Sequence, residues 1–322
     1  MIAMPSRQRG VALLVALLVV ALAVILVAAL LDRGELALAR TRNALRAEQA
    51  EAYAQGLEIY AAQVLQDPTL GGGLDTNASP WALPLPPQPV PGGVISATMH
   101  DLNGCFNINN LSVAHGNPGL WRPVFQKLLK ALSIDPRLDE AVNAWLDPHA
   151  SDANRYLALP VAYRPRGDVF AHVSELRLVQ GVSGDIYARL APHVCALPPG
   201  TMINIDTAGV PVLQSLGLSR AVAENLWQNG AAHWSTTQYK TQLTQLGVVL
   251  DSNLDSWITT TSTYFLARGD IVLDDVPFTF YSLIERVQNR PIAVLERSRG
   301  SDDALVAPAP IGVDHSSDAT LD

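Results

Sequence analysis

Two thiols are the most reactive side chains in the sequence. Cys105 and Cys195 are its 2 cysteines, and neither a C-x-x-C motif nor a Cys/His spacing typical of zinc sites accompanies them. In an exported chain such a pair most simply forms a disulfide. In a reducing compartment the same residues would be two buried thiols, so the chemistry depends on where the chain is delivered.

Catalytic constellations are absent from the sequence. The 7 histidines are scattered, and the chain has no H-E-x-x-H, G-x-S-x-G or P-loop motif. His172 and Glu175 stand at helical spacing, which more often indicates a surface contact than an acid-base pair. We therefore expect a protein that is not an enzyme.

One pattern indicates phosphate binding. Residues 210–227 contain two helical segments joined by Leu216-Gly217-Leu218, which resembles a helix-hairpin-helix, a module that grips DNA phosphates at helix N-termini. Arg220 is the one basic residue in this stretch, Asp206 and Glu224 are acidic, and the net charge of the chain is −8. Protein packing is the favoured interpretation, and a membrane-tethered periplasmic module for DNA or another polyanion is the alternative.

The elements that carry these residues begin with an apolar run at the N-terminus. Residues 11–31 contain no charged or strongly polar side chain, and at about 1.5 Å per residue they are long enough to cross a bilayer. Arg7 and Arg9 precede the run and favour a cytoplasmic N-terminus. The run is too long for a secretory signal, and Ala21-Leu22-Ala23 lies in its middle. We expect a retained anchor with most of the chain outside the cytoplasm.

The helical pattern continues beyond the anchor. From Asp32 to about Gln66 the chain is rich in Ala, Leu, Glu, Arg and Gln, with apolar positions every three or four residues, until Asp67-Pro68 ends it. The sequence predicts one continuous helix over 11–67, whose second half lies against a folded body. The apolar stripe expected to form a helix-packing interface consists of Leu45, Tyr53, Leu57, Tyr60 and Val64.

Strand and helix patterns then alternate. Residues 68–110 are interpreted as a linker and first strands: the prolines of 79–93 predict an extended connector with few hydrogen bonds, and a strand turn is expected at Asn103-Gly104. Residues 111–200 are interpreted as an inserted helical domain. A second helical segment, with the helix-hairpin-helix character described above, is expected at 201–255.

The chain returns to strand patterns near its C-terminus. Residues 256–297 alternate in hydrophobicity like an antiparallel meander, broken near Gly269-Asp270 and at 289–291. Residues 298–322 are polar, small and acidic, which predicts a disordered tail. The predicted sheet is therefore split by a large, mostly helical insertion.

This order of segments resembles the type IV pilin and pseudopilin class, in which a short basic leader ends in Gly, here Gly10, directly before an apolar helix. Most members have Glu as the fifth mature residue, where this chain has Val15. The segments DLNGCFNINNL, AVNAWLD, SELRLVQGV, INIDTA and FLARGDI make the chain similar to one atypical branch, minor pseudopilin K of type II secretion systems. The similarity covers roughly residues 5–295.

The resemblance implies an α+β, pilin-like fold. A long N-terminal transmembrane α-helix would pack on an antiparallel β-sheet, which a large, mostly α-helical insertion of SAM-like or helix-hairpin-helix type interrupts. Residues 1–10 would be a prepilin leader, cut between Gly10 and Val11 by a prepilin peptidase that also methylates the new N-terminus. The chain would cross the inner membrane once, with its N-terminus cytoplasmic and its bulk periplasmic.

The resemblance also implies an assembly role at the tip of a pseudopilus, where the chain would help to start assembly and export of folded proteins. Expected partners are the I, J and possibly H minor pseudopilins, the major pseudopilin, the prepilin peptidase and the inner-membrane assembly platform, with no nucleic acid. A carboxylate in a membrane is costly without a neutralising neighbour. In most members a neighbouring subunit would neutralise the Glu, and a subunit with Val15 needs no such neighbour. The bulky insertion would also be hard to stack inside a filament. Both features therefore suit a position with no subunit above it. A minor pilin of a type IV pilus is the alternative.

Calcium is the one cofactor that the resemblance suggests. Related K proteins carry an acidic calcium-binding stretch at the position of residues 147–152, and calcium takes about six to eight oxygen ligands. Asp147, Asp152 and Asn154 keep oxygen ligands, whereas His149 and Ala153 stand where acids are expected. An ordinary solvated loop is therefore favoured over a calcium site.

Overall fold

The structure is a computed structural model, and it describes residues 7–67, 74–149, 156–228, 234–288 and 290–300. The chain divides into two compact units, one ending at Tyr53 and the other beginning at Ala54. The first helix belongs to both units, and all other described elements lie in the second.

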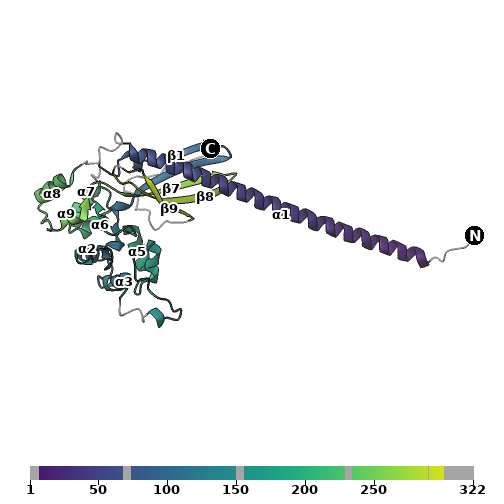
Figure 1. Cartoon of the computed structure of the whole chain (residues 1–322), viewed down its shortest axis with the longest axis horizontal. Coiled ribbons are helices and arrows are strands. Elements are labelled where there is room, and N and C mark those ends of the chain that lie inside the picture. Colours follow the sequence, from purple (N-terminus) through teal and green to yellow (C-terminus); the bar gives the residue numbers. More distant parts are fainter. Residues whose placement is uncertain (1–6, 68–73, 150–155, 229–233, 289, 301–322) are drawn as a thin grey trace, which may run out of the picture. The chain divides into compact units, whose positions relative to one another are not determined.

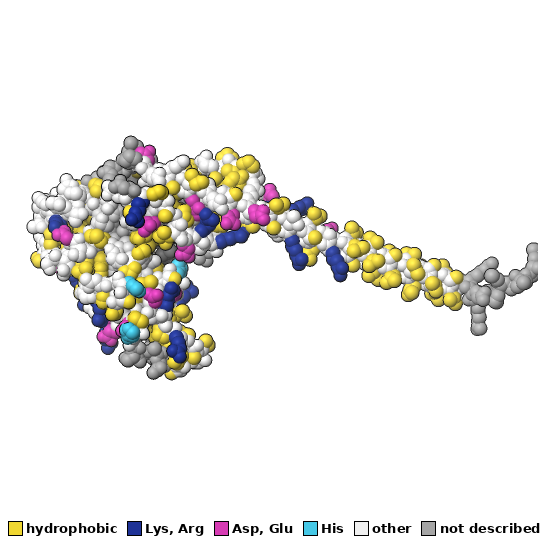
Figure 2. Space-filling model, viewed as in Figure 1, with side chains coloured by type: hydrophobic (Ala, Val, Ile, Leu, Met, Phe, Trp, Pro, Cys, Tyr) yellow, Lys and Arg dark blue, Asp and Glu magenta, His cyan; other side chains and the backbone are white. Residues whose placement is uncertain are grey.

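Helix α1 (Arg7–Gln66) is 60 residues long and contains no proline (Figure 1). Within the described chain it is the one helix long and apolar enough to cross a membrane, with a mean hydropathy of 3.4 in its most apolar window. Side chains from Val11 to Leu31 are exposed, and Figure 2 shows them as a continuous apolar surface. By length and composition, this part of α1 fits a single-pass membrane anchor.

Five antiparallel strands form the main sheet, in the order β1-β2-β7-β8-β9. Their bounds are β1 Leu85–Val90, β2 Gly93–Asp101, β7 Tyr264–Leu273, β8 Val276–Glu285 and β9 Ala293–Arg299. Strands β2 and β7 are neighbours, with Asp101 opposite Phe265, although the whole insertion lies between them in the sequence. The insertion thus leaves and re-enters the sheet at one end, and the prediction of a split sheet is confirmed.

The insertion consists of short helices and two small parallel strand pairs, β3-β4 and β5-β6. The strands are β3 Phe106–Asn107, β4 Val194–Cys195, β5 Ile203–Asn204 and β6 Ile258–Thr259. The α-helices are α2 Pro118–Ala131, α3 Leu138–Leu146, α5 Gly184–Leu190, α6 Val210–Ser215, α7 Arg220–Gln228, α8 Thr236–Gln245 and α9 Leu254–Trp257. The 3-10 helices are η1 Pro80–Ala82, which precedes the sheet, η2 Leu102–Gly104, η3 Ile108–Leu111, η4 Val173–Leu178 and η5 Ala191–His193. In Figure 1 the labelled helices of the insertion gather to the left of and below the strands β7, β8 and β9.

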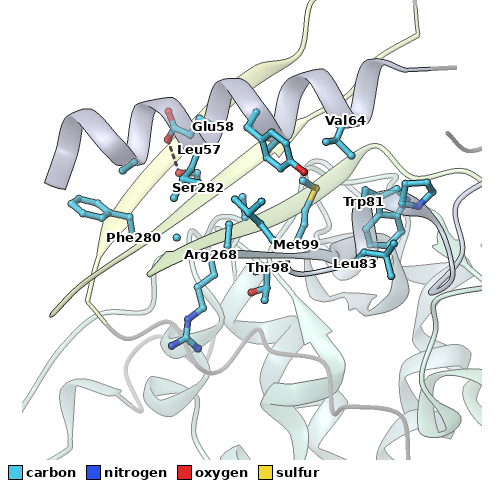
Figure 3. A pocket seen from close by; sticks show the side chains of 18 residues that line it. Leu57, Glu58, Val64, Trp81, Leu83, Thr98, Met99, Arg268, Phe280 and Ser282 are labelled. Carbon is cyan, nitrogen blue, oxygen red and sulfur yellow. Dashed lines mark hydrogen bonds between the residues drawn. The ribbon is translucent and has the colours of Figure 1, made fainter. Parts of the chain in front are cut away.

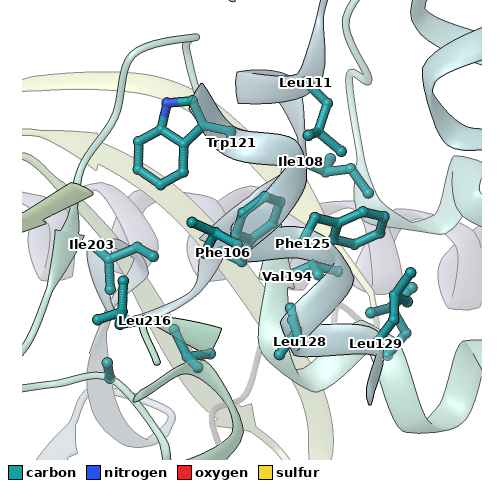
Figure 4. Packing of buried hydrophobic residues seen from close by; sticks show 14 of the residues in the cluster. Phe106, Ile108, Leu111, Trp121, Phe125, Leu128, Leu129, Val194, Ile203 and Leu216 are labelled. Atoms are coloured by element: carbon teal, nitrogen blue, oxygen red, sulfur yellow. The ribbon is translucent and has the colours of Figure 1, made fainter. Parts of the chain in front are cut away.

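A single hydrophobic core holds the insertion together. Phe106 stacks on Phe125 with ring centroids 5.2 Å apart and meets Trp121 edge-on at 5.9 Å (Figure 4). The same cluster of buried residues continues through Leu216 to Ile258. The segments that the sequence separates at residue 200 therefore share one core.

Two local expectations before the insertion are wrong. The proline-rich stretch is not an unbonded connector, because its residues 85–90 form β1, paired with β2. Proline is tolerated there since β1 is an edge strand, whose outward N–H groups need no partner in the sheet. Asn103-Gly104 does not form a strand turn either: it lies in η2, and the β3 strand that follows pairs with β4 in parallel.

The meander at the C-terminus is confirmed, but its first turn lies further along the chain. Strand β7 continues through Gly269-Asp270, and the turn falls at Asp274-Asp275, whose φ angles are 45° and 63°. A two-residue hairpin turn of this kind needs positive φ at both positions, which aspartate tolerates better than most residues. Strand β9 extends to Arg299, two residues beyond the expected end of the strands at residue 297.

Candidate functional site

The face of α1 that lies on the sheet is built from small and medium residues. Ala54, Leu57, Ala61 and Leu65 recur every three or four residues and are all buried, with exposed fractions of 8% or less. Leu57 sits over Gly269 of β7, where an added methyl group would lie 2.8 Å from the Leu57 Cδ1 atom. Glycine at this position therefore lets the helix approach the sheet closely.

A buried ion pair fixes the register of this helix face on the sheet. Arg297 of β9 donates from Nε to Glu58 Oε1 (2.7 Å) and from its terminal nitrogen to Oε2 (2.5 Å), and the Ser282 hydroxyl donates to Oε1 (2.5 Å). Burial alone would raise the pKa of Glu58, but the hydrogen bonds from Arg297 and Ser282 and the Arg297 charge outweigh it, so the pKa lies below its ordinary value. Glu58 is thus held ionised at neutral pH.

The residues of the predicted helix-packing stripe differ in their burial. Leu57 packs on the chain's own sheet, Val64 is half-buried against the Trp81 cluster, and Tyr60 is 44% exposed. Leu45 is 60% exposed, and the hydroxyl of the half-buried Tyr53 accepts a hydrogen bond from Gln49. The buried face differs from the predicted stripe because its members include two alanines and a glutamate, whereas the prediction relied on large apolar side chains.

Tyr60 and Val64 of the stripe border a groove between α1 and the β1 side of the sheet, which we call the α1–β1 groove (Figure 3). Tyr60 and Val64 contribute to its helix wall. Its opposite wall comes from η1 and β1, and its floor from β2, β7 and β8. The lining residues include Ala61, Pro80, Leu83, Leu85, Ala97, Met99, Ala267 and Gly269.

A polar cluster joins the sheet to the insertion. The Asp101 Oδ2 atom, at the end of β2, accepts hydrogen bonds from the Thr207 hydroxyl (2.5 Å), the Ser262 hydroxyl (2.6 Å) and Asn204 Nδ2 (3.1 Å). Burial raises the pKa of Asp101 to about 6, although the hydrogen bonds from Ser262, Thr207 and the Asn103 N–H oppose the shift. Because Asp101 ends the last strand before the insertion, this cluster clamps the insertion at its exit and re-entry points.

Asp75 extends the clamp to the segment that follows α1. Its carboxylate pairs with Arg286 and accepts hydrogen bonds from Trp81 Nε1 (3.1 Å) and the Ser262 N–H (2.7 Å). Asn204 donates to its backbone oxygen (2.9 Å). The chain segments after α1, before β7 and after β8 are therefore tied to one carboxylate.

A third buried acid lies nearby in the insertion. Asp206 Oδ1 accepts a hydrogen bond from the Tyr239 hydroxyl, while Oδ2 is buried without a hydrogen-bond partner. Burial raises the pKa of Asp206 to about 7, opposed by the Tyr239 hydrogen bond and reinforced by the charge of Asp75. Among the residues that the structure describes, no group of three His, Cys, Asp or Glu side chains is arranged to hold a metal ion.

The two cysteines form a disulfide in the structure, with Cα atoms 5.9 Å apart. Cys195 lies in β4, opposite Asn107 of β3, and Cys105 directly precedes β3. The bond therefore closes the base of the first part of the insertion, a loop with a sequence separation of 90 residues.

The remaining predicted sites are only partly described. Gly10 lies within α1 and Val11 is 62% exposed, so the cut between them stays a prediction. Asp147 accepts a hydrogen bond from the His149 N–H (2.8 Å), whereas Asp152 and Asn154 lie outside the described residues. A calcium site therefore also stays a prediction.

Two other patterns have local structural roles. Helices α6 and α7 are joined at Gly217 (φ 97°), but Arg220 pairs with Glu224 on its own helix (2.7 Å). His172 caps η4, where its Nδ1 accepts from the Ser174 N–H (3.2 Å) and Glu175 accepts from the His172 N–H (3.3 Å).

The sequence did not predict a structural role for Asp75, Asp101 and Asp206, the three buried acids near the junction of sheet and insertion. Asp101 and Asp206 nevertheless lie in two of the segments that carry the family resemblance.

Comparison with known proteins supplies the identification. Residues 104–199 match the family described as type II secretion system (T2SS), protein K. The chain is 32% identical to type II secretion system protein K of Pectobacterium carotovorum subsp. carotovorum, covering 92% of this chain and 98% of that protein. The chain belongs to the type II secretion system protein K family. The protein K of Pseudomonas aeruginosa PAO1 is also 32% identical, over 92% of this chain and 94% of that protein.

One solved structure contains a chain with the same fold as this one. The structure of the GspK-GspI-GspJ complex from the type 2 secretion system of enterotoxigenic Escherichia coli contains a chain that superposes with a TM-score of 0.71. That match has 27% identity and covers 81% of this chain and 99% of the other. The pilin-like fold with a helical insertion that the resemblance implies is therefore confirmed.

Proposed function

We propose that this member of the protein K family is a minor pseudopilin at the tip of a type II secretion pseudopilus. There it would help to start filament assembly and thereby the export of folded proteins. The observation that carries the proposal is the similarity to the E. coli chain from the GspK-GspI-GspJ complex, which extends over 99% of that chain. We infer that this chain also assembles with I-type and J-type minor pseudopilins, and with the H-type and major pseudopilins below them.

The proposed life cycle begins in the inner membrane. The apolar run would be inserted with the N-terminus in the cytoplasm, and a prepilin peptidase would cut between Gly10 and Val11. The exposed apolar surface from Val11 to Leu31 supports both a stay in lipid and later packing among other pseudopilin helices. Because the cut precedes the run, the mature chain would keep its whole anchor.

The position of the insertion supports a place at the tip. It leaves the sheet after Asp101 and returns before Phe265, so its entire core lies beyond one end of the sheet. The hydrogen bonds of Asp75 and Asp101 hold that body to the sheet at both crossings. A rigid body of this size would obstruct a subunit stacked on the same end, so we infer that no subunit follows.

The polyanion-binding alternative has less support. The pairing of Arg220 with Glu224 leaves α7 without an unpaired basic group at its start, and the chain carries a net charge of −8. Phosphate binding depends on Lys and Arg that neutralise backbone charge.

Co-purification tests the proposal. The full-length chain, tagged at its C-terminus and produced with the I- and J-type pseudopilins of its own secretion system, would be captured from detergent-solubilised membranes. We expect both partners in amounts comparable to the tagged chain, and neither when an unrelated tagged single-pass protein replaces it. Capture of the tagged chain without either partner would contradict the proposal.

A further inference from the structure

The two sulfur atoms of the disulfide differ in their access to solvent. Cys195 has an exposed fraction of 0%, whereas Cys105 is half-buried and lines a narrow cleft near the point where the insertion leaves the sheet. We propose that this cleft is a thiol-exchange site, at which an incoming thiol attacks Cys105 rather than Cys195. The proposal concerns the redox chemistry of the chain and does not depend on its place in a pseudopilus.

The cleft, which we call the thiol cleft, lies between two short 3-10 helices and a pair of α-helices. One wall belongs to η2 and η5, which precede the two cysteines in the sequence. The other wall belongs to the α6–α7 pair, through Gly209, Val212 and Trp227. This is the pair that resembles a helix-hairpin-helix, yet its basic residue Arg220 is not among the described residues that line the cleft. The pair thus borders the accessible sulfur.

The walls of the thiol cleft are fixed to one another. A methyl group added to Gly104, the residue before Cys105, would lie 2.8 Å from the Thr207 backbone oxygen. Glycine there lets η2 pack directly on the turn that precedes α6. The Thr207 hydroxyl also donates to Asp101 Oδ2 (2.5 Å) at the end of β2. The cleft is therefore part of the packed junction between sheet and insertion.

Exchange at Cys105 follows a defined course. The sulfur of the incoming thiolate bonds to Cys105 Sγ, the bond between the two Sγ atoms breaks, and its electron pair leaves on Cys195 Sγ. The new thiolate is formed within an apolar cluster that includes Leu197, Leu266 and Tyr281. An apolar environment disfavours a thiolate, so Cys195 is a poor leaving group. It later takes a proton from water or attacks Cys105 again and closes the bond.

The reverse direction assigns a separate role to each cysteine during oxidation. An oxidising disulfide would exchange with the accessible Cys105 thiolate and form a mixed disulfide there. The Cys195 thiolate would then attack Cys105 Sγ and expel the thiolate of the oxidant into water. This second step removes a charge from the apolar cluster and is therefore favourable. Cys105 is the exchanging cysteine and Cys195 the resolving one.

The lining of the thiol cleft favours an uncharged thiol. Pro192, Val212 and Trp227 are apolar, and the described lining contains neither Lys nor Arg. Burial lowers the pKa of His193, so its imidazole carries no charge at neutral pH. Asp101, whose pKa burial raises to about 6, is ionised at neutral pH and would repel an anionic thiol. The expected reagent is thus a neutral thiol, or a cysteine flanked by apolar residues.

A substitution that fills the cleft tests the proposal. Gly209 lines the cleft with a φ angle of −69°, and an added Cβ atom would meet no described atom within 4 Å. Gly209→Phe should therefore place a ring in the cleft without straining the backbone. The disulfide of the full-length chain in non-ionic micelles would be reduced with 2-mercaptoethanol, and free thiols would be alkylated and counted by mass spectrometry. We expect Gly209→Phe to slow reduction roughly tenfold or more.

Gly184→Phe is the matched control, because Gly184 begins α5, has the same open space around an added Cβ atom and does not line the cleft. It should be reduced as fast as the unaltered chain. Equal rates for Gly209→Phe and the unaltered chain would overturn the proposal. A rate for the unaltered chain that does not depend on thiol concentration would also overturn it, because reduction would then follow opening of the insertion.

Two further readouts of the same reaction identify the attacked sulfur and the preferred thiol. Peptide mapping of acid-quenched samples should place the mixed disulfide with 2-mercaptoethanol on Cys105, and an adduct on Cys195 would contradict the assignment of roles. At equal thiolate concentration, the anionic 2-mercaptoethanesulfonate should reduce the bond more slowly than 2-mercaptoethanol. Faster reduction by the anionic thiol would refute the preference for an uncharged one.

Discussion

At the residue scale, the junction between sheet and insertion depends on acids that are buried rather than exposed. Asp101 accepts hydrogen bonds from three side chains, and Asp206 is held by one tyrosine hydroxyl. Burial raises the pKa of both, to about 6 and about 7 respectively. A charge at either position is costly once solvent is excluded, so these residues connect the stability of the junction to pH.

The pH dependence of unfolding should reveal Asp206. Its pKa rises from 3.8 to about 7 on folding, so between these values the native state holds a proton that the unfolded state has lost. The free energy of unfolding should therefore fall as the pH rises through this window. Relative to Asp206→Asn, which has no proton to lose, the unaltered chain should lose about 1.4 kcal/mol for each pH unit.

Tryptophan fluorescence during chemical unfolding of the full chain in micelles is a suitable readout, because all 6 tryptophans lie at or beyond position 81. Asp185→Asn, at an acid with a side chain that is 76% exposed, is the control. If the free energy of unfolding depended on pH in the same way for the unaltered chain and for Asp206→Asn, burial would not raise the pKa of Asp206, and the prediction would be wrong.

The residue scale is also where sequence reasoning is weakest. Glu58 sits in a helix face that otherwise contains alanine and leucine, and nothing local indicates that Ser282 and Arg297 will meet it. Such partners come from the far end of the chain, so the contact follows from tertiary packing alone. The same holds for Asp75 and its partner Arg286.

At the element scale, the sequence predicted the helices that follow from local apolar patterns, and it missed elements that depend on their place in the sheet. Helix α1 was predicted from an unbroken apolar run followed by apolar residues every three or four positions, and the helical segments within 111–200 and 201–255 were predicted from helical patterns of the same kind. Strand β1 was missed because three prolines hide a strand that only an edge position allows. The turn at Asp274-Asp275 was missed because it contains no glycine or asparagine.

The disulfide should be the strongest constraint on the first part of the insertion. Cys105→Ala/Cys195→Ala opens a loop with a sequence separation of 90 residues, which should lower the free energy of unfolding by about 4 kcal/mol on the chain-entropy view. The measurement is chemical unfolding of the double variant beside the oxidised chain. The reduced unaltered chain is the matched control and should unfold like the variant, whereas equal stability of oxidised and reduced chains would contradict the prediction.

At the scale of the whole molecule, the sequence predicted the architecture better than its details. A sheet split by a helical insertion follows from the order of strand-like and helix-like segments, and the pairing of Asp101 opposite Phe265 confirms it. The sequence did not predict that the helical segments on either side of residue 200 share one core, because that depends on contacts such as those between α2 and α6. Membership of the protein K family places this architecture in a secretion machine.

The proposed function requires that the chain mature as a pseudopilin and keep its apolar helix. The most direct test is the N-terminal sequence and intact mass of the chain purified from the membranes of its own host. We expect a mature protein that begins with N-methylated Val11. An N-terminus at Met1, or one created beyond Ala23 within the apolar run, would contradict it, because such a chain would be a simple anchor or a secreted protein rather than a filament subunit.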